Sequence, residues 1–260
     1  MWPRWKRWVA GSYVFCIYLF LYLPIMILVA YSFNRSKLNA IWTGFTLNWY
    51  IALARDTTIV HAAWNSLIVA IFSTIIAATI GTLGAIGMFR YRFRGKTVLS
   101  ALLYIPMIMP EIVMGISLLV FFSMIKVPLG LISLILAHAT FCIPFVALTV
   151  IARLEGFDRH LEEAAMDLGA NNLQTLRYVT IPVIRPGILA GMLLSFTLSL
   201  DDVIISFFVS GPGSMTLPLK IYSMVKVAVT PEINALSTVM IVITLVLVLV
   251  AESFQLKKAA

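Results

Sequence analysis

The chain has 260 residues, of which 61% are hydrophobic and only 12% are charged, and its formal net charge is +8. So few charged residues cannot give a globular core of this size a polar surface, which excludes an ordinary soluble domain and indicates an all-α integral membrane protein. The basic residues are divided among short connections and form no basic face, so the charge does not predict binding to nucleic acid.

Six apolar segments are long enough to cross a lipid bilayer, which takes roughly twenty helical residues. An even number of spans would place both termini on the same side of the membrane. In chain order, the predicted spans are Trp8–Phe33, His61–Met88, Val98–Ile125, Leu129–Ile151, Gly187–Ser210 and Ile233–Phe254.

The Lys and Arg residues favour one side of this arrangement, and the side richer in them is normally cytoplasmic. This rule predicts that both termini are cytoplasmic, together with the second and fourth connections. The poorer side has Arg35, Lys37, Arg55, Lys126, Lys220 and Lys226. The richer side has Arg4, Lys6, Arg7, Arg90, Arg92, Arg94, Lys96, Arg153, Arg159, Arg177, Arg185, Lys257 and Lys258.

Two aromatic residues, Trp49 and Tyr50, precede the second predicted span. An aromatic face attracts an ammonium group, so the pair could lie at the entrance of a pore for cations. Aromatic residues also gather at membrane interfaces for purely structural reasons, and both interpretations stay open.

Small residues recur where two spans are expected to pack closely, because the absence of a side chain lets helix backbones approach each other. We expect such contacts in the second span and at the start of the fifth. The glycines concerned are Gly81, Gly84, Gly87, Gly187 and Gly191.

Two motifs for ligand chemistry are incomplete. Gly95–Thr97 has the end of a phosphate-binding loop, but that motif needs a glycine where Arg90 stands and a strand before it. The histidines, among them His138, have no second ligand at helical spacing, which favours structural roles over a metal site. The sequence therefore predicts no nucleotide cofactor and no metal in this chain.

The third span contains two prolines, Pro106 and Pro110, which should kink or break it because each removes a backbone donor. Glu111 would then begin the following helical half. Its carboxylate could simply be stabilised by the helix dipole, or it could face a pore, and both interpretations stay open.

A polar stretch, Leu161–Asn172, interrupts this largely apolar chain after the fourth span. It predicts a short helix of about ten residues, in which Asp158 caps the start and Gly169 ends the helix in a left-handed conformation. A second short segment, Asn172–Thr180, should end at Pro182 and Pro186. The stripe of Leu161, Ala164, Ala165 and Leu168 is narrow and mostly small, with Glu163 and Asp167 beside it.

The face formed by this stripe has two possible uses. An interfacial helix resting on lipid normally carries basic residues and large apolar anchors, whereas this face is acidic and rich in alanine. Docking to a basic surface of a cytoplasmic partner is the second interpretation.

The fifth span contains two adjacent acids, Asp201 and Asp202. An aspartate at the centre of a membrane helix costs roughly 3 kcal/mol, so the two are expected to face a cavity or a partner. Ser195, Ser199, Asp202 and Ser206 recur along one side of a helix. This polar stripe predicts a path for a cation, with Asp201 on its shoulder.

The loop also carries a family motif. Glu163, Ala164, Ala165, Asp167, Gly169 and Ala170, followed by Val179–Pro182, resemble the EAA loop of ABC-importer permeases, with Ile181 where Leu is more usual. Further stretches resemble the family of second membrane permeases in bacterial spermidine/putrescine importers. They are SFNRSK, YRFRGK, AHATFCIPF, SFTLSLDDVIISFFVSGPG and LPLKIYSMVKVAVTPEINAL.

The resemblance implies a type I ABC importer permease of the MetI-like class, with six transmembrane helices and a cytoplasmic EAA coupling helix, in a bacterial inner membrane. Residues 1–61 would precede a core permease domain at 62–255, whose EAA loop covers about 153–185. The chain would be a non-enzymatic half of the pore. Its partners would be a homologous second permease, two ATP-binding subunits that use ATP and Mg²⁺, and an extracytoplasmic polyamine-binding protein.

The resemblance also implies roles for individual residues: Glu163, Ala164, Ala165, Asp167, Gly169 and Ala170 would couple to the ATPase. Asp201, Asp202, Ser199, Glu111 and Trp49 are our candidates for the substrate path. The alternative function is an ion- or proton-coupled transporter of cationic solutes that uses Asp201, Asp202 and Glu111 as a relay, although such transporters often contain paired broken helices. The sequence does not rank spermidine against putrescine.

Overall fold

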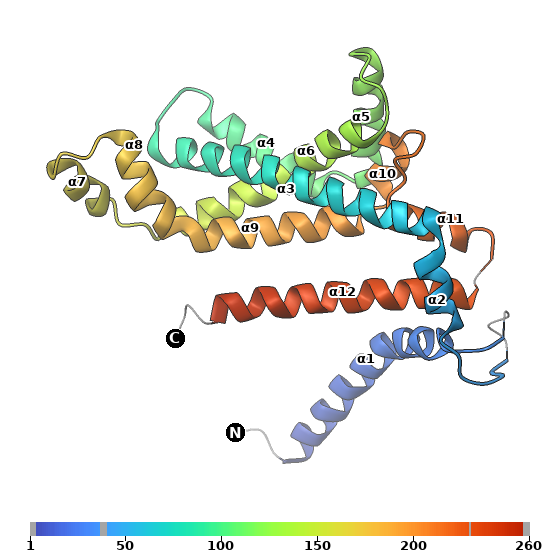
Figure 1. Ribbon diagram of the computed structural model, residues 1–260. Coiled ribbons are helices and arrows are strands. Elements are labelled where there is room, and N and C mark those ends of the chain that lie inside the picture. The colour runs from blue at the N-terminus through green and yellow to red at the C-terminus, as the bar shows by residue number, and fades with distance from the viewer. Residues whose placement is uncertain (1–3, 37–40, 229, 257–260) are drawn as a thin grey trace. The chain divides into compact units, whose positions relative to one another are not determined.

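The computed structural model describes residues 4–36, 41–228 and 230–256, and its named elements are all helical (Figure 1). Lys37, Lys257 and Lys258 from the charge count lie outside these residues. The helices are α1 (Arg4–Tyr31), α2 (Asn48–Arg55), α3 (Thr57–Arg90), α4 (Lys96–Ile108), α5 (Glu111–Met124), α6 (Leu131–Glu155), α7 (His160–Asp167), α8 (Asn172–Thr175), a π-helical turn (Leu176–Thr180), α9 (Ile181–Asp201), α10 (Ile204–Val209), α11 (Leu217–Val225) and α12 (Pro231–Leu256).

The chain forms two compact units. One contains Met1–Val60 and Ile221–Leu249, and the other contains His61–Lys220 and Val250–Ala260. The predicted domains at 1–61 and 62–255 divide the chain at nearly the same first boundary but differ in the placement of Ile221–Leu249. That division stays a prediction.

Four helical stretches of the described chain are long and apolar enough to cross a membrane: Ala10–Tyr31, Thr57–Arg90, Leu131–Glu155 and Asn172–Asp201. A fifth is possible if the bent pair α4 and α5 is one span, and the apolar part of α12 that is described, Pro231–Val246, is shorter. The prediction of an all-helical membrane protein is confirmed, whereas the count of six spans stays a prediction.

The third predicted span is broken, as expected, and its halves α4 and α5 meet at 111°. The break lies at Met109 and Pro110, whose backbones are extended, and Glu111 begins α5 as predicted. Pro106 lies inside α4 and does not interrupt it. Only the second proline therefore ends a helix.

The fifth predicted span differs from expectation at both ends. Pro182 and Pro186 do not stop the preceding segment, because the π-helical turn ends with Ile181 N–H donating to Leu176 O and leads directly into α9. The wider turn places Pro182, which lacks an N–H, in the first turn of α9, where no donor is needed. At the other end, α9 stops at Asp201 because Asp202 is extended, and α10 starts at Ile204.

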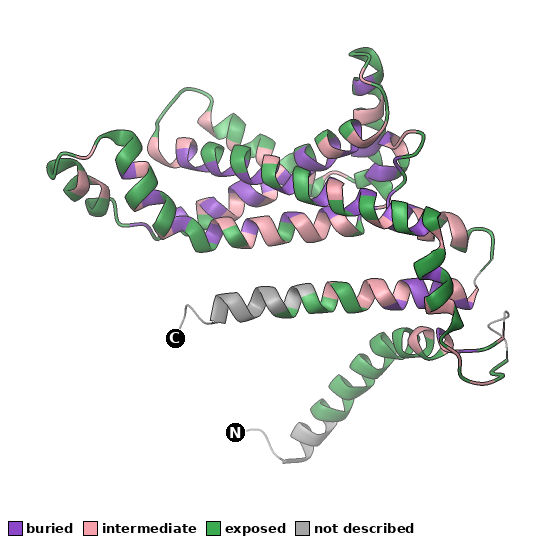
Figure 2. Ribbon diagram, viewed as in Figure 1, coloured by how far each residue is buried: buried purple, intermediate pink, exposed green. Residues whose placement is uncertain are grey.

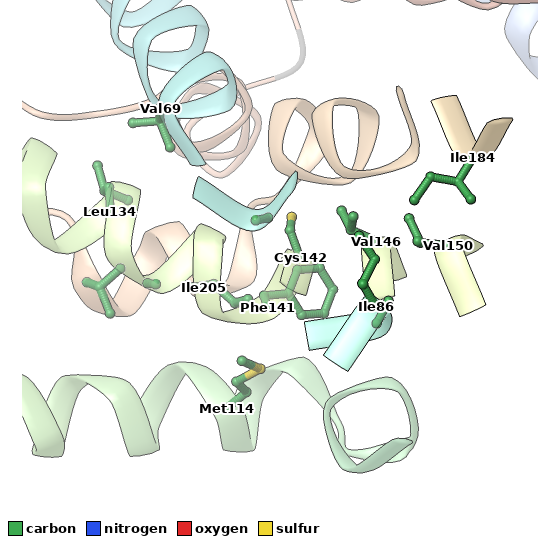
Figure 3. Packing of buried hydrophobic residues seen from close by; sticks show 14 of the residues in the cluster. Val69, Ile86, Met114, Leu134, Phe141, Cys142, Val146, Val150, Ile184 and Ile205 are labelled. Carbon is green, nitrogen blue, oxygen red and sulfur yellow. The ribbon is translucent and has the colours of Figure 1, made fainter. Parts of the chain in front are cut away.

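The core of the second unit is the interface of α6 with α3 and α9. Val146 of α6 lies at its centre, close to Cys142, Val150, Ile184 and Ile86 (Figure 3). Most of these side chains are completely buried. Because α6 is covered on several sides, it is the scaffold on which the neighbouring helices are placed.

Glycines allow this close packing at some of the predicted positions. A Cβ on Gly81 would lie 2.9 Å from Val146 Cβ, and one on Gly191 would lie 3.1 Å from Val146 Cα. Gly187 is similarly close to Arg153. A Cβ on Gly84 or Gly87 would meet no atom of the described residues within 4 Å, so the prediction is confirmed within the chain for three glycines and stays a prediction for these two.

Candidate functional site

The loop after α6 folds into a short helix with defined ends. Asp158 Oδ1 accepts a hydrogen bond from His160 N at 3.0 Å, but the residue directly before α7 is Arg159, so Asp158 lies one position before the cap that was predicted for it. Helix α7 then covers eight residues, two fewer than expected. Gly169 follows with φ of +90°, and Ala170 N donates to Ala165 O at 3.0 Å, so the predicted left-handed end is confirmed.

The next segment begins with reciprocal hydrogen bonds. Asn171 Oδ1 accepts from Gln174 N at 2.9 Å, and Gln174 Oε1 accepts from Asn171 N at 2.8 Å. This capping box satisfies two backbone donors at the start of α8. The glycine turn and the capping box together fix the path of the chain between α7 and α8.

One acid of α7 is tied to the second span. Arg90, the last residue of α3, donates to a carboxylate oxygen of Glu162 and also to Thr180 Oγ1, the latter at 2.8 Å. The Thr180 hydroxyl donates to Glu162 as well. This latch of Arg90, Glu162 and Thr180 joins the end of α3, the helix α7 and the start of α9.

A second attachment lies beside this latch. The Arg159 guanidinium donates to the backbone carbonyl of Phe89 at 3.0 Å and lies 4.7 Å above the Phe89 ring. An arginine over an aromatic ring gains electrostatic attraction in addition to the hydrogen bond. The base of the loop is therefore held against α3 at two points.

The outer part of the loop has few such contacts. Leu168 is 91% exposed and Leu173 is 72% exposed, and Ala164 of the predicted stripe is exposed too. In Figure 2 most of the ribbon of α7 has the colour of exposed residues. Glu163 and Asp167 are exposed, and the Glu163 carboxylate lies 3.1 Å from His160 Nδ1. Leu161, Ala164 and Leu168 of the predicted stripe are thus exposed, and Ala165 is half-buried.

A polar cluster lies at the break between α9 and α10. His138 of α6 is 1% exposed, and its Nδ1 lies 2.7 Å from Ser199 Oγ while its Nε2 lies 3.1 Å from Ser206 Oγ. Nε2 is also 3.4 Å from Asp202 Oδ2. Asp202 in turn accepts hydrogen bonds from the backbone N–H groups of Ile205 and Ser206. The expected structural role of His138 agrees with this geometry.

This cluster separates the candidates for the substrate path. Ser199 and Asp202 are buried and turn toward His138, whereas Asp201 and Glu111 are exposed on the same unit. The two adjacent aspartates therefore have different surroundings. As a substrate path, all four residues stay a prediction.

Trp49, the remaining candidate, belongs to the other unit. Its indole Nε1 donates to the backbone carbonyl of Asn34 at 2.7 Å, and Tyr50 Oη lies 2.6 Å from Ser32 Oγ. Both aromatic residues hold α2 to the segment that directly follows α1. This geometry accounts for them structurally, and a role of Trp49 in cation entry stays a prediction.

Comparison with known proteins decides the family. The family profile described as binding-protein-dependent transport system inner membrane component matches residues 79–256. The chain belongs to this inner membrane component family. Membership confirms the prediction of a transport subunit rather than an enzyme, and it places the matched region from the middle of α3 to the end of α12.

Two groups of relatives within the inner membrane component family are similar over most of the chain. The spermidine/putrescine transport system permease protein PotC of Escherichia coli (strain K12) is 49% identical over 95% of this chain and 93% of its own length. PotC of Haemophilus influenzae is 47% identical over 95% of this chain and 96% of its own length. The putrescine transport system permease protein PotI of Escherichia coli (strain K12) is 44% identical over 85% of this chain and 82% of its own length.

Solved structures share the fold of this inner membrane component at low identity. A chain of a bacterial ABC transporter involved in the import of the acidic polysaccharide alginate aligns with a TM-score of 0.78 at 17% identity, covering 98% of this chain and 99% of that chain. A chain of the MetNI methionine ABC transporter aligns with a TM-score of 0.65 at 18% identity, covering 75% of this chain and 94% of that chain. The predicted ABC-permease fold is confirmed.

The sequence did not predict the latch. Arg90 counts among the basic residues of the richer side and stands where a phosphate-binding loop needs a glycine, and neither pattern indicates Glu162 or Thr180 as its partner. A signal was present, because an arginine side chain pairs well with a carboxylate or phosphate, and Arg90 ends a long apolar helix. The polar contacts of His138 were equally invisible, since they join residues more than sixty positions apart.

Proposed function

We propose that this chain is one of two homologous permease subunits in an ATP-driven importer of polyamines. The observation that carries this proposal is the 49% identity to a spermidine/putrescine permease over 95% of the chain. The range that the family profile matches also contains the acidic helix break and the loop. The polyamine substrate, spermidine or putrescine or both, is inferred from the names of these relatives.

In this proposal the loop couples the chain to an ATP-binding subunit dimer that binds ATP and Mg²⁺. Support comes from the exposed stripe on α7, from the exposed carboxylates of Glu163 and Asp167, and from the fixed turn at Gly169. The latch of Arg90, Glu162 and Thr180 anchors the base of the same loop. In this proposal the chain has six spans, both termini in the cytoplasm and an EAA loop at about 153–185. A second permease and an extracytoplasmic binding protein complete the transporter.

The proposed substrate path uses carboxylates, because a polyamine is a cation that loses part of its water inside a pore. Asp201 and Glu111 are exposed on this unit and are the stronger candidates for direct contact. Asp202 and Ser199 would act indirectly, because their contacts with His138 hold the end of α9 in place. The ion- or proton-coupled alternative is not favoured, since it gives no role to the exposed loop.

Reconstitution tests this function. We expect the assembled complex in liposomes to accumulate labelled spermidine or putrescine when ATP and the binding protein are supplied. This chain alone should take up neither compound, with or without a pH step, because it provides half a pore and no motor. Uptake driven by a pH step with this chain alone would contradict the proposal and support the secondary transporter.

A further inference from the structure

A cavity of about 500 Å³ lies between the C-terminal ends of α3 and α6 and the first part of α4, beside the base of the loop. Four basic side chains line it: Arg90, Arg92, Lys96 and Arg159. The lining includes one acid, Glu155, so positive charge prevails. A cavity with this charge attracts an anion.

Part of this positive charge is not neutralised within the chain. Arg90 is paired with Glu162, and the Arg159 guanidinium is directed to the Phe89 carbonyl. In the described residues no carboxylate forms an ion pair with Arg92 or Lys96, and Lys96 Nζ has only the carbonyl of Tyr91 at 3.5 Å. These two cations are therefore available to a ligand.

The remaining wall of the cavity is apolar and continues along α4. Leu103, Leu148 and Ile151 line it together with Tyr104. No residue of α4 is buried, and its side chains include exposed apolar groups such as Val98 at 63% and Leu102 at 52%. A basic recess at the end of a membrane helix that continues into bare apolar surface matches a molecule with an anionic head and hydrocarbon chains.

We propose that this cavity binds the phosphate headgroup of an anionic phospholipid, whose acyl chains lie along α4. Free inorganic phosphate would satisfy the same cations but would leave the apolar wall without a partner. Because Arg90 and Arg159 also hold the loop, the lipid would lie directly behind the latch and would support the position of α7. This inference does not depend on which solute is transported.

The test uses the assembled transporter, delipidated in a neutral detergent and titrated with phosphatidylglycerol or with phosphatidylcholine of the same chain length, with native mass spectrometry as readout. We expect tighter binding of phosphatidylglycerol. The double variant Arg92→Gln/Lys96→Gln should lose roughly 30-fold in affinity, since each basic group near an anionic surface contributes about a fivefold factor. Arg92→Lys keeps the charge and should bind nearly as the parent does, and Arg185→Gln, which removes a cation outside the cavity, is the control.

Three results would overturn the proposal. Equal binding of the two lipids would show that the cavity does not recognise charge. Displacement of phosphatidylglycerol by millimolar inorganic phosphate would identify a site for phosphate itself. Unchanged lipid binding in the double variant, with loss of the ATP-binding subunit, would assign the cavity to an acidic segment of that partner.

Discussion

His138 and Asp202 face each other across the break between α9 and α10, with Nε2 of the imidazole 3.4 Å from Oδ2 of the carboxylate. The same imidazole contacts Ser199 on α9 and Ser206 on α10. One side chain of α6 therefore holds both helices at the point where the chain leaves the helical conformation. The Asp202 carboxylate then accepts from two backbone donors in the first turn of α10, as a cap does, and Asp201, one residue before it, is exposed.

This arrangement predicts different effects for two substitutions of Asp202. Asp202→Asn keeps an oxygen that accepts from the backbone N–H groups of Ile205 and Ser206, whereas Asp202→Ala removes it. Loss of a helix cap costs about 1 kcal/mol. We expect the alanine variant to have a clearly lower Tm than the asparagine variant in detergent, and equal values would contradict the capping role.

His138→Leu provides an independent check of the same cluster. The substitution removes the contacts of the imidazole with Ser199, Ser206 and Asp202, and a hydrogen bond of this kind contributes about 0.5–1.5 kcal/mol. We expect a larger loss of thermal stability than for His61→Leu, which removes an exposed histidine. Thermal unfolding of the purified complex measures the difference, and comparable values would show that the cluster does not hold the break.

The two helix breaks show what sequence reasoning could reach. The break at Pro110 was predictable, because proline lacks the backbone donor that a helix requires. The break at Asp202 was not, because aspartate is compatible with a helix and only its distant contacts with His138 and the start of α10 make the extended conformation favourable. At Pro182 the sequence predicted a break that is absent. A π-helical turn places this proline in the first turn of α9, where its missing N–H leaves no hydrogen bond unmade.

The loop was predicted well for a related reason. The hydrogen bond of Asp158 to His160 and the turn at Gly169 act within a few positions of the chain, and local chemistry can be read from local sequence. The latch joins Arg90 to residues more than seventy positions away, so nothing near Arg90 identified Glu162.

The latch predicts energetic coupling between the end of α3 and the loop. Arg90→Gln and Glu162→Gln each remove one partner of a charge-assisted hydrogen bond, worth about 1.5–3 kcal/mol. The double variant should be little worse than either single variant, because both remove the same interaction. ATPase activity and Tm of the four complexes measure this cycle; additive losses would mean that the two side chains act independently.

The backbone conformation of Gly169 predicts that substitutions there weaken docking even when the new side chain is small. Its φ of +90° disfavours any residue with a Cβ by roughly 1–2 kcal/mol, while the space around it is open. We expect Gly169→Ala to weaken co-purification of the ATP-binding subunit and Gly169→Asn to weaken it less, since asparagine tolerates this conformation. Gly169→Trp and Glu163→Arg, which alter the exposed surface directly, should abolish transport while membrane insertion survives.

Two glycines of α3 predict opposite changes in stability. Gly81→Ala would force a Cβ to within 3.0 Å of Ile143 O and 3.1 Å of Ala147 N, and overpacking of this kind costs about 1–3 kcal/mol. Gly84→Ala meets open space and should stabilise the helix by about 0.5–1 kcal/mol. The Tm values of the two variants test this, and a similar decrease in both would place a partner surface at Gly84.

The exposed acids give the prediction that bears most directly on transport. Asp201→Asn and Glu111→Gln keep the shape of the side chain and remove only its charge, and neither carboxylate has a described salt bridge to lose. We therefore expect labelled spermidine or putrescine uptake to fall strongly for Asp201→Asn and less for Glu111→Gln, while assembly and Tm stay at the parental values. Asp202→Asn is the matched control, because its charge faces His138. Reduced uptake with parental Tm in Asp201→Asn places that carboxylate on the substrate path. If Asp202→Asn alone lost uptake while Asp201→Asn transported normally, the path would depend on the cluster around His138, and the exposed acids would have to contact the second permease instead.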